Sequence, residues 1–237
     1  PLRNPTVLAK EIATLDFLSK GRVLPAIGLG TEDDREFEAC GALRSERAAR
    51  TDEAIQVMRK LWSEDDVTFH GDFFTLNGVT VEPKPVQEEL PPIWIGGRTT
   101  AAMKRVARLG DGWLVSQATP EEVKAGIQKI NVWAGEYDRE IEDDHFGALI
   151  SFCISDSKKD AEEISAPYRF KRRTDVDYRA FSAFGTVDDV VDTIDRYIDA
   201  GATKFVGYPT CPPSMMMEQL ELLGREIVPR YHGLKVN

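Results

Sequence analysis

The segment Ile93–Thr100 carries the groups best suited to binding an anion. Its apolar residues predict a short buried strand, Gly96-Gly97 predicts a turn, and Thr99 or Thr100 can cap a following helix. The first N–H groups of that helix and the positive end of its dipole would face a ligand above the turn. Arg98 adds a charged fork for phosphate oxygens. The segment predicts a phosphate site, and a turn that binds nothing is an equally good interpretation of the motif alone.

Other residue types that could do chemistry form no recognisable site in the sequence. The cysteines have neither metal-ligand spacing nor the even number of a disulfide framework. The histidines have no nucleophile or metal partner nearby in the sequence, and the acidic run 32–38 is typical of a solvated loop and a short helix. These residues are Cys40, Cys153, Cys211, His70, His145 and His232. We therefore predict no metal site and assign no catalytic residue.

A basic run lies within the long connection Pro167–Phe184. It consists of Arg169, Lys171, Arg172 and Arg173. Such a run is most often a solvated loop, but long connections in compact domains are frequently functional. Because this one also carries aromatic residues, the alternative is a mobile lid over the site that offers charge to an anionic ligand.

Composition sets limits on the class of protein. With 237 residues and 42% hydrophobic content, the chain can bury a large core, and the sequence shows no linker that would divide it. We therefore expect a single domain over residues 1–237. The net charge of −10 argues against a nucleic-acid partner. No apolar run is long enough to span a membrane, no secretory signal is visible, and the cysteine usage favours a reducing, cytoplasmic location.

Predicted strands and helices alternate along the chain, which indicates a parallel sheet covered by helices. Most helices begin at a residue that can cap them, and the strands are nearly all apolar. A β-hairpin excursion is expected at about 67–83, where Asn77-Gly78 suits a tight turn. The expected helices are 4–19, from 45, 99–109, 119–137, from 157, 186–200 and 214–227. The expected strands are 22–29, 93–95, 112–115, 148–154 and 204–207.

Two parallel architectures fit this order, an open doubly wound sheet and a closed (β/α)8 TIM barrel. Gly28-Leu29-Gly30 follows a strand, but the third glycine of a dinucleotide fingerprint is missing and acidic residues follow instead. Several predicted strands end in small or polar residues that could face one shared mouth. Because the active site of a barrel lies at the C-terminal ends of its strands, the pattern favours the barrel.

An ordered set of short motifs resembles one family, the luciferase-like monooxygenase superfamily of FMN- or F420-dependent (β/α)8-barrel oxidoreductases. The resemblance covers nearly the whole chain, and its order makes it specific although each motif is weak. The motifs are Arg3-Asn4-Pro5, Ala13–Arg22, Gly28–Gly30, Arg47, Asp52–Ile55, Leu61-Trp62, His70-Gly71, Pro83–Pro85, Pro92–Gly97, Leu109–Trp113, Gly185-Thr186 and Tyr197–Ala202. In this family the Ala13–Asp16 helix follows the third barrel strand, so the resemblance implies that the first strands are absent from the chain.

The resemblance implies a cofactor, FMN or F420, and positions for it. The phosphate end would lie at Gly96, Gly97, Arg98 and Thr99, and the ring beside Gly28 and Gly30. Ser116 and Gln117 would meet the phosphate or the ribityl chain. The structural alternatives are tight packing for Gly28 and Gly30 and an ordinary loop for Ser116 and Gln117.

The implied activity depends on the cofactor. Reduced FMN supports oxygenation of a small organic substrate, whereas F420 exchanges a hydride with it. The family also implies a homodimer. Two alternatives remain: a non-catalytic flavin-binding relative, and a phosphate-binding barrel lyase or isomerase. The latter requires a Schiff-base lysine or an acid–base pair at a strand end, and Lys204, at a strand start, is its only plausible lysine.

Overall fold

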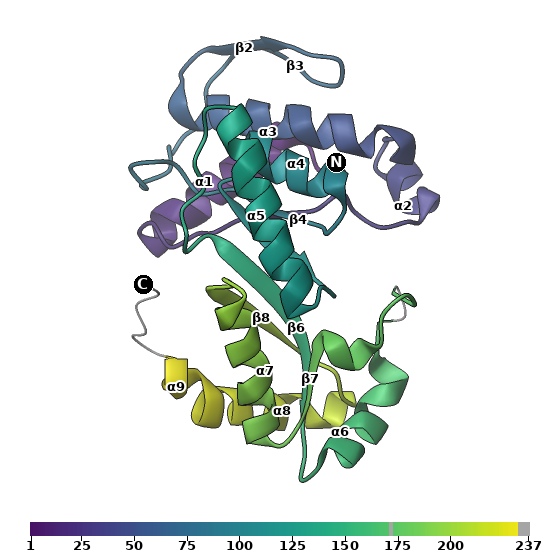
Figure 1. The fold of residues 1–237 in the computed structure, drawn as a ribbon. Helices are drawn as coiled ribbons and strands as arrows, with labels where there is room; N and C mark the ends of the chain where they lie inside the picture. Colours follow the sequence, from purple (N-terminus) through teal and green to yellow (C-terminus); the bar gives the residue numbers. More distant parts are fainter. Residues whose placement is uncertain (171–172, 232–237) are drawn as a thin grey trace. The chain divides into compact units, whose positions relative to one another are not determined.

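The computed structural model describes residues 1–170 and 173–231 (Figure 1). Lys171 and Arg172 of the basic run lie outside the described residues. The chain divides into two compact units, residues 1–96 with 105–112 and residues 97–104 with 113–237. Within the described parts, no helix is both long and apolar enough to cross a membrane.

The first unit is organised around two long helices, α1 (Pro5–Ser19) and α3 (Arg47–Ser63), which lie side by side (Figure 1). As predicted, Asn4 caps α1, because its side-chain oxygen accepts the N–H groups of Thr6 and Val7. Buried Trp62 joins the helices, since its Nε1 donates to the Ala9 carbonyl at 3.0 Å. The unit also contains α2 (Asp34–Ala39) and the 3-10 turn η1 (Arg44–Glu46).

Two short parallel strands complete this unit, β1 (Ala26–Ile27) and β4 (Trp94–Gly96). The predicted strand 22–29 is shortened to β1, because only Ala26 and Ile27 take part in the register with β4. The hairpin region contains the antiparallel strands β2 (Val67–His70) and β3 (Thr75–Val79). The Glu53 carboxylate holds its turn by accepting the N–H groups of residues 72, 73 and 74.

In the second unit, β6 (Phe146–Ile154) is the central strand. β8 (Lys204–Pro209) pairs with residues 147–152 of β6. β5 (Gly112–Ser116) and β7 (Ser182–Gly185) pair with residues 146–149 and 151–154. Since β8 already occupies one edge of β6 along most of this length, β5 and β7 follow one another along the other edge. All these pairs are parallel, as predicted for an α/β fold.

Three helices of this unit begin where a side chain caps the first turn by hydrogen bonding. They are α5 (Pro120–Glu136), α6 (Lys158–Ser165) and α7 (Val187–Asp199). Thr119 and Thr186 form reciprocal capping boxes with Glu122 and Asp189, and Ser157 caps α6. α4 (Thr100–Leu109) also lies where it was predicted. These starts confirm the boundaries predicted from the sequence. They were predictable because a cap depends on only four neighbouring residues.

Two predictions for the later part of the chain need correction. The single helix expected over 214–227 is divided into η4 (Pro213–Met215), α8 (Met216–Leu222), the π-helical segment η5 (Leu223–Ile227) and α9 (Val228–Tyr231). Pro229 has no N–H to donate, which disfavours regular α-helical bonding there. The connection expected over 167–184 contains the 3-10 turns η2 (Ala166–Tyr168) and η3 (Tyr178–Ala180), and its last residues belong to β7.

Candidate anion-binding site

Gly97 forms a turn that only glycine fits well. Its φ of 112° lies in a region that residues with side chains rarely adopt, and an added Cβ would lie 2.8 Å from the Ala102 side chain. The Gly97 carbonyl accepts a hydrogen bond from Trp113 Nε1 at 2.8 Å. Trp113 is buried, and it also fixes the turn, which the sequence did not reveal. The backbone before α4 is therefore anchored on a large core side chain.

Thr99 starts α4 and leaves donors available at its first turn. Its hydroxyl accepts the Ala102 N–H at 3.2 Å, and its carbonyl accepts the Met103 N–H at 2.9 Å. The N–H groups of Thr100 and Ala101 have no acceptor among residues 1–170 and 173–231. Such groups, together with the helix dipole, favour an anion at this position.

Arg98 provides a cation beside these donors. Its side chain is exposed, and it forms no hydrogen bond or ion pair within the described chain. Two carboxyl groups lie within its electrostatic reach, Glu122 and Asp175. Hydrogen bonds from Arg173 are the main cause of the lowered pKa of both carboxyls, and the charge of Arg98 adds a smaller contribution. Arg98 therefore keeps its guanidinium donors for a ligand.

Ser116 and Gln117 follow at the C-terminal end of β5, in the same unit. Ser116 is exposed. Gln117 has a φ of 53°, a left-handed conformation that costs about 1 kcal/mol or more in a residue with a side chain. Its carbonyl accepts a hydrogen bond from Arg173 Nη1 at 2.6 Å. An arginine 56 residues away in the chain thus holds this loop in place.

Arg173 is the functional candidate that the sequence did not identify. Its side chain is only 2% exposed, so it does not belong to a solvated loop. Its guanidinium donates to both carboxylate oxygens of Glu122, at 2.6 and 2.5 Å, and to those of Asp175, at 3.0 and 3.1 Å. These partners raise its pKa further above the ordinary value for arginine. Glu122 and Arg173 lie 51 residues apart in the chain, so the sequence did not reveal this pairing.

Gly28 and Gly30 belong to the first unit. They line a mostly apolar cavity of about 520 Å³ beside α1 and α3. Gly30 has a φ of 81°, and an added Cβ would lie 3.2 Å from the Phe37 ring, so the structure itself requires glycine there. A Cβ at Gly28 would meet nothing within 4 Å. Tight packing therefore accounts for Gly30 but not for Gly28.

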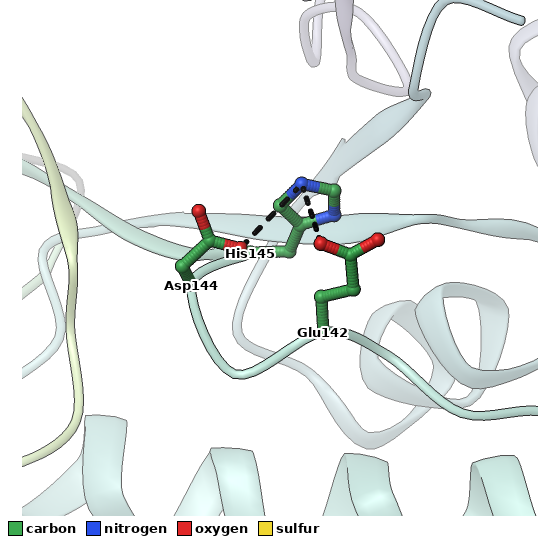
Figure 2. Close-up of side chains that lie close together, drawn as sticks. All are labelled: Glu142, Asp144 and His145. Carbon is green, nitrogen blue, oxygen red and sulfur yellow. Dashed lines mark ion pairs between the residues drawn. The ribbon is translucent and has the colours of Figure 1, made fainter. Parts of the chain in front are cut away.

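A cluster of possible metal ligands lies before β6 (Figure 2). His145 Nε2 is 3.8 Å from a carboxylate oxygen of Glu142 and 3.8 Å from one of Asp144, so the histidine is not isolated as the sequence suggested. However, the Lys204 ammonium donates to the Asp144 side chain at 2.9 Å and to its carbonyl at 2.6 Å. This hydrogen bond lowers the pKa of Asp144. A lysine already neutralises this carboxylate, and the cluster does not support a metal site.

The same contact bears on the lyase or isomerase alternative. A Schiff-base lysine must lose its proton in a site that disfavours the charge. Lys204 instead begins β8 and is paired with Asp144. The only lysine that the sequence offered for this chemistry therefore has a structural role.

Two further features of the second unit are apolar. A cavity of about 230 Å³ separates β6 and β8 from α7 and η5, and it has no converging polar groups. Burial raises the pKa of the Cys153 thiol to about 11, so this cysteine is an unreactive core residue. Among the described residues of this unit, Arg98, Ser116, Gln117 and their neighbours are the better candidates for binding a charged ligand.

Comparison with known proteins identifies the relatives of the chain. A family model described as luciferase-like monooxygenase matches residues 1–174. The FMNH(2)-dependent dimethylsulfone monooxygenase of Pseudomonas fluorescens is 30% identical over 185 residues, which cover 77% of this chain and 48% of that enzyme. The F420-dependent glucose-6-phosphate dehydrogenase of Segniliparus rotundus is 27% identical over 259 aligned residues, covering 98% of this chain and 76% of that enzyme. The chain thus spans about half the length of the Pseudomonas enzyme.

Solved structures show the same fold. The monooxygenase RslO1 from Streptomyces bottropensis superimposes with a TM-score of 0.80 over 97% of this chain and 75% of that one, at 22% identity. The structural neighbours are luciferase-like TIM barrels, and the parallel α/β arrangement of this chain is consistent with part of such a barrel. The predicted fold class is confirmed.

Proposed function

The chain belongs to the luciferase-like monooxygenase family, and we propose that it binds FMN or coenzyme F420 and acts in the oxidation or oxygenation of a small organic substrate. Relatives include an FMNH(2)-dependent monooxygenase and an F420-dependent dehydrogenase. The structural observation that carries the proposal is the turn before α4, where Arg98 and the first N–H groups of the helix have no competing partner among the described residues. Both cofactors carry a phosphate that such a turn can hold.

The donors of this turn fit a phosphate. Arg98 provides a charged fork, and the N–H groups of Thr100 and Ala101 provide neutral donors. Trp113 and the Thr99 cap hold the backbone in position before a ligand arrives, which reduces the entropic cost of binding. Ser116 and Gln117, from the adjoining loop of the same unit, contact the phosphate or the chain attached to it.

The protein contributes binding, orientation and exclusion of water, and the cofactor supplies the reactive chemistry. Bound reduced FMN would supply oxygen chemistry, and bound F420 would supply hydride transfer. Gly28, whose glycine identity packing does not explain, lies with Gly30 beside the ring system in this proposal. That residues 1–237 form a single barrel domain stays a prediction.

The absorbance spectrum of the purified protein tests this proposal. A retained flavin, or binding of added FMN at micromolar concentration, supports an FMN enzyme. A deazaflavin band, or selective binding of F420, supports an F420 enzyme. Binding of neither cofactor would contradict the proposal. Binding without oxidation of any substrate would instead favour the alternative of a non-catalytic flavin-binding relative.

We also propose that the protein forms a homodimer. Helix α1 exposes large apolar residues on its outer side, Val7, Leu15, Phe17 and Leu18, at 55–70%. This surface is a candidate for the apolar centre of an interface, which in a stable dimer buries more than about 1,000 Å² in total. Light scattering at micromolar concentration should give twice the chain mass of 26.5 kDa. The mass of a single chain, measured also with the cofactor bound, would contradict the proposed homodimer.

A further inference from the structure

Arg173 connects the segment after η2 to the loop that borders the candidate anion site. Five of its hydrogen bonds end on Gln117, Glu122 and Asp175. A guanidinium that is 98% buried and bound on all sides fixes its partners firmly, because each bond to a charged group is stronger than a neutral one. The backbone carbonyl of Gln117 and the carboxylate of Glu122 therefore have defined positions.

The carboxylate of Glu122 is a potential competitor of the ligand. It lies close enough to Arg98 for the charge of Arg98 to contribute to its lowered pKa. A carboxylate in this region without a cationic partner would attract the Arg98 guanidinium and repel a phosphate. In the structure, however, the Glu122 carboxylate forms its ion pair with Arg173, although its side chain is 43% exposed and could turn elsewhere.

We propose that Arg173 is a positioning residue that binds the carboxylates of Glu122 and Asp175 and so keeps Arg98 available for the phosphate of the cofactor. The inference rests on the proposed function and deepens it. Arg173 touches neither the phosphate nor the reacting atoms, since its guanidinium is occupied by protein oxygens. It acts on affinity for the charged part of the ligand. It leaves recognition of the ring unchanged.

The test compares FMN with riboflavin, which carries the same ring and ribityl chain without the phosphate. Binding of each is measured by fluorescence titration of the full chain at fixed ionic strength. Arg173→Gln should weaken FMN binding about tenfold, within the range of coupling between neighbouring charges, and change riboflavin binding less than about twofold. The triple variant E122Q/R173Q/D175N should recover FMN affinity to within about threefold of the wild type, because both carboxylates within the electrostatic reach of Arg98 are then absent.

Arg179→Gln is the matched control. Arg179 lies in the same segment and forms a similar fork to Glu162 on α6, with both distances at 2.8 Å. Its loss should leave the ratio of FMN to riboflavin affinity unchanged. A tenfold selective loss in this variant as well would overturn the inference, because any disturbance of the segment would then be sufficient.

A second variant is expected to change FMN affinity in the opposite direction. This test does not depend on the stability of Arg173→Gln. Glu122→Gln preserves an oxygen for the Thr119 cap and leaves Arg173 with one carboxylate partner, Asp175, instead of two, so FMN should bind about two- to threefold more tightly. Riboflavin binding should not change. Weaker or equal FMN binding by folded Glu122→Gln would contradict the proposal, as would a triple variant E122Q/R173Q/D175N that binds as poorly as Arg173→Gln.

The controls also separate this inference from the proposed function. If the wild type shows no preference for FMN over riboflavin, and F420 does not bind, then the phosphate site itself is wrong. If the preference exists and depends on Arg98 but is independent of Arg173 and Glu122, the site stands and only the positioning role is wrong.

Discussion

Replacing Asp16 by alanine is expected to lower the free energy of unfolding by about 3–4 kcal/mol. Asp16 is fully buried on α1, where its carboxylate accepts the backbone N–H groups of Val86 and Gln87 at 2.8 and 3.2 Å. It also accepts the Gln87 side-chain amide at 2.6 Å. Alanine removes all three hydrogen bonds at once and leaves donors without partners, which costs about 1–3 kcal/mol for each group that remains buried.

Urea unfolding followed by circular dichroism measures this loss. The matched control is Glu11→Ala on the same helix, where the carboxylate is 52% exposed and its ion pair with Arg3 is 3.7 Å long. We expect that control to change stability by less than about 0.5 kcal/mol. Equal effects of the two variants would show that the buried network around Asp16 does not hold α1 to the segment at Val86.

Replacing Arg98 by alanine is expected to weaken FMN binding by about 1.5–3 kcal/mol, or roughly 10- to 150-fold in dissociation constant. The guanidinium is exposed and has no partner among the described residues, so its charge is available for the phosphate. Riboflavin, without a phosphate, should bind the variant as it binds the wild type. The same difference should appear for F420 if the deazaflavin is the natural cofactor.

Lys104→Ala serves as the control for charge alone. Lys104 lies on α4 as well, but its ammonium rests 5.2 Å from the centre of the Trp133 ring. Removing it changes the net charge by the same amount as removing Arg98. An equal loss of FMN affinity in both variants would argue for a general electrostatic effect instead of a direct contact by Arg98.

Local chemistry explains why much of the fold was predictable. Asn4, Thr119 and Thr186 cap helices through atoms within three residues, so their roles can be read from short motifs. The glycine turn before α4 was recognised for the same reason. The family resemblance then supplied the barrel class, because an ordered series of such motifs is more specific than any one of them.

Long-range pairing explains what was missed. Arg173 reads as part of a basic surface run, and only the fold brings it against Gln117 and Glu122. Trp113 reads as a core residue, and its hydrogen bond to Gly97 depends on the approach of two segments sixteen residues apart. β7 escaped prediction because four buried residues between a loop and a cap are too short to show a period.

The most direct measurement of the central claim is an amide and indole NMR titration of the full chain with FMN and, separately, with F420. The phosphate is predicted to shift the N–H signals of residues 98–102 and the Trp113 indole, which is bonded to the turn at Gly97. Riboflavin should shift these signals much less than FMN. Saturating binding that leaves residues 98–102 unmoved, with changes confined to the cavity beside α7 and η5, would contradict the assignment of this turn as the phosphate site.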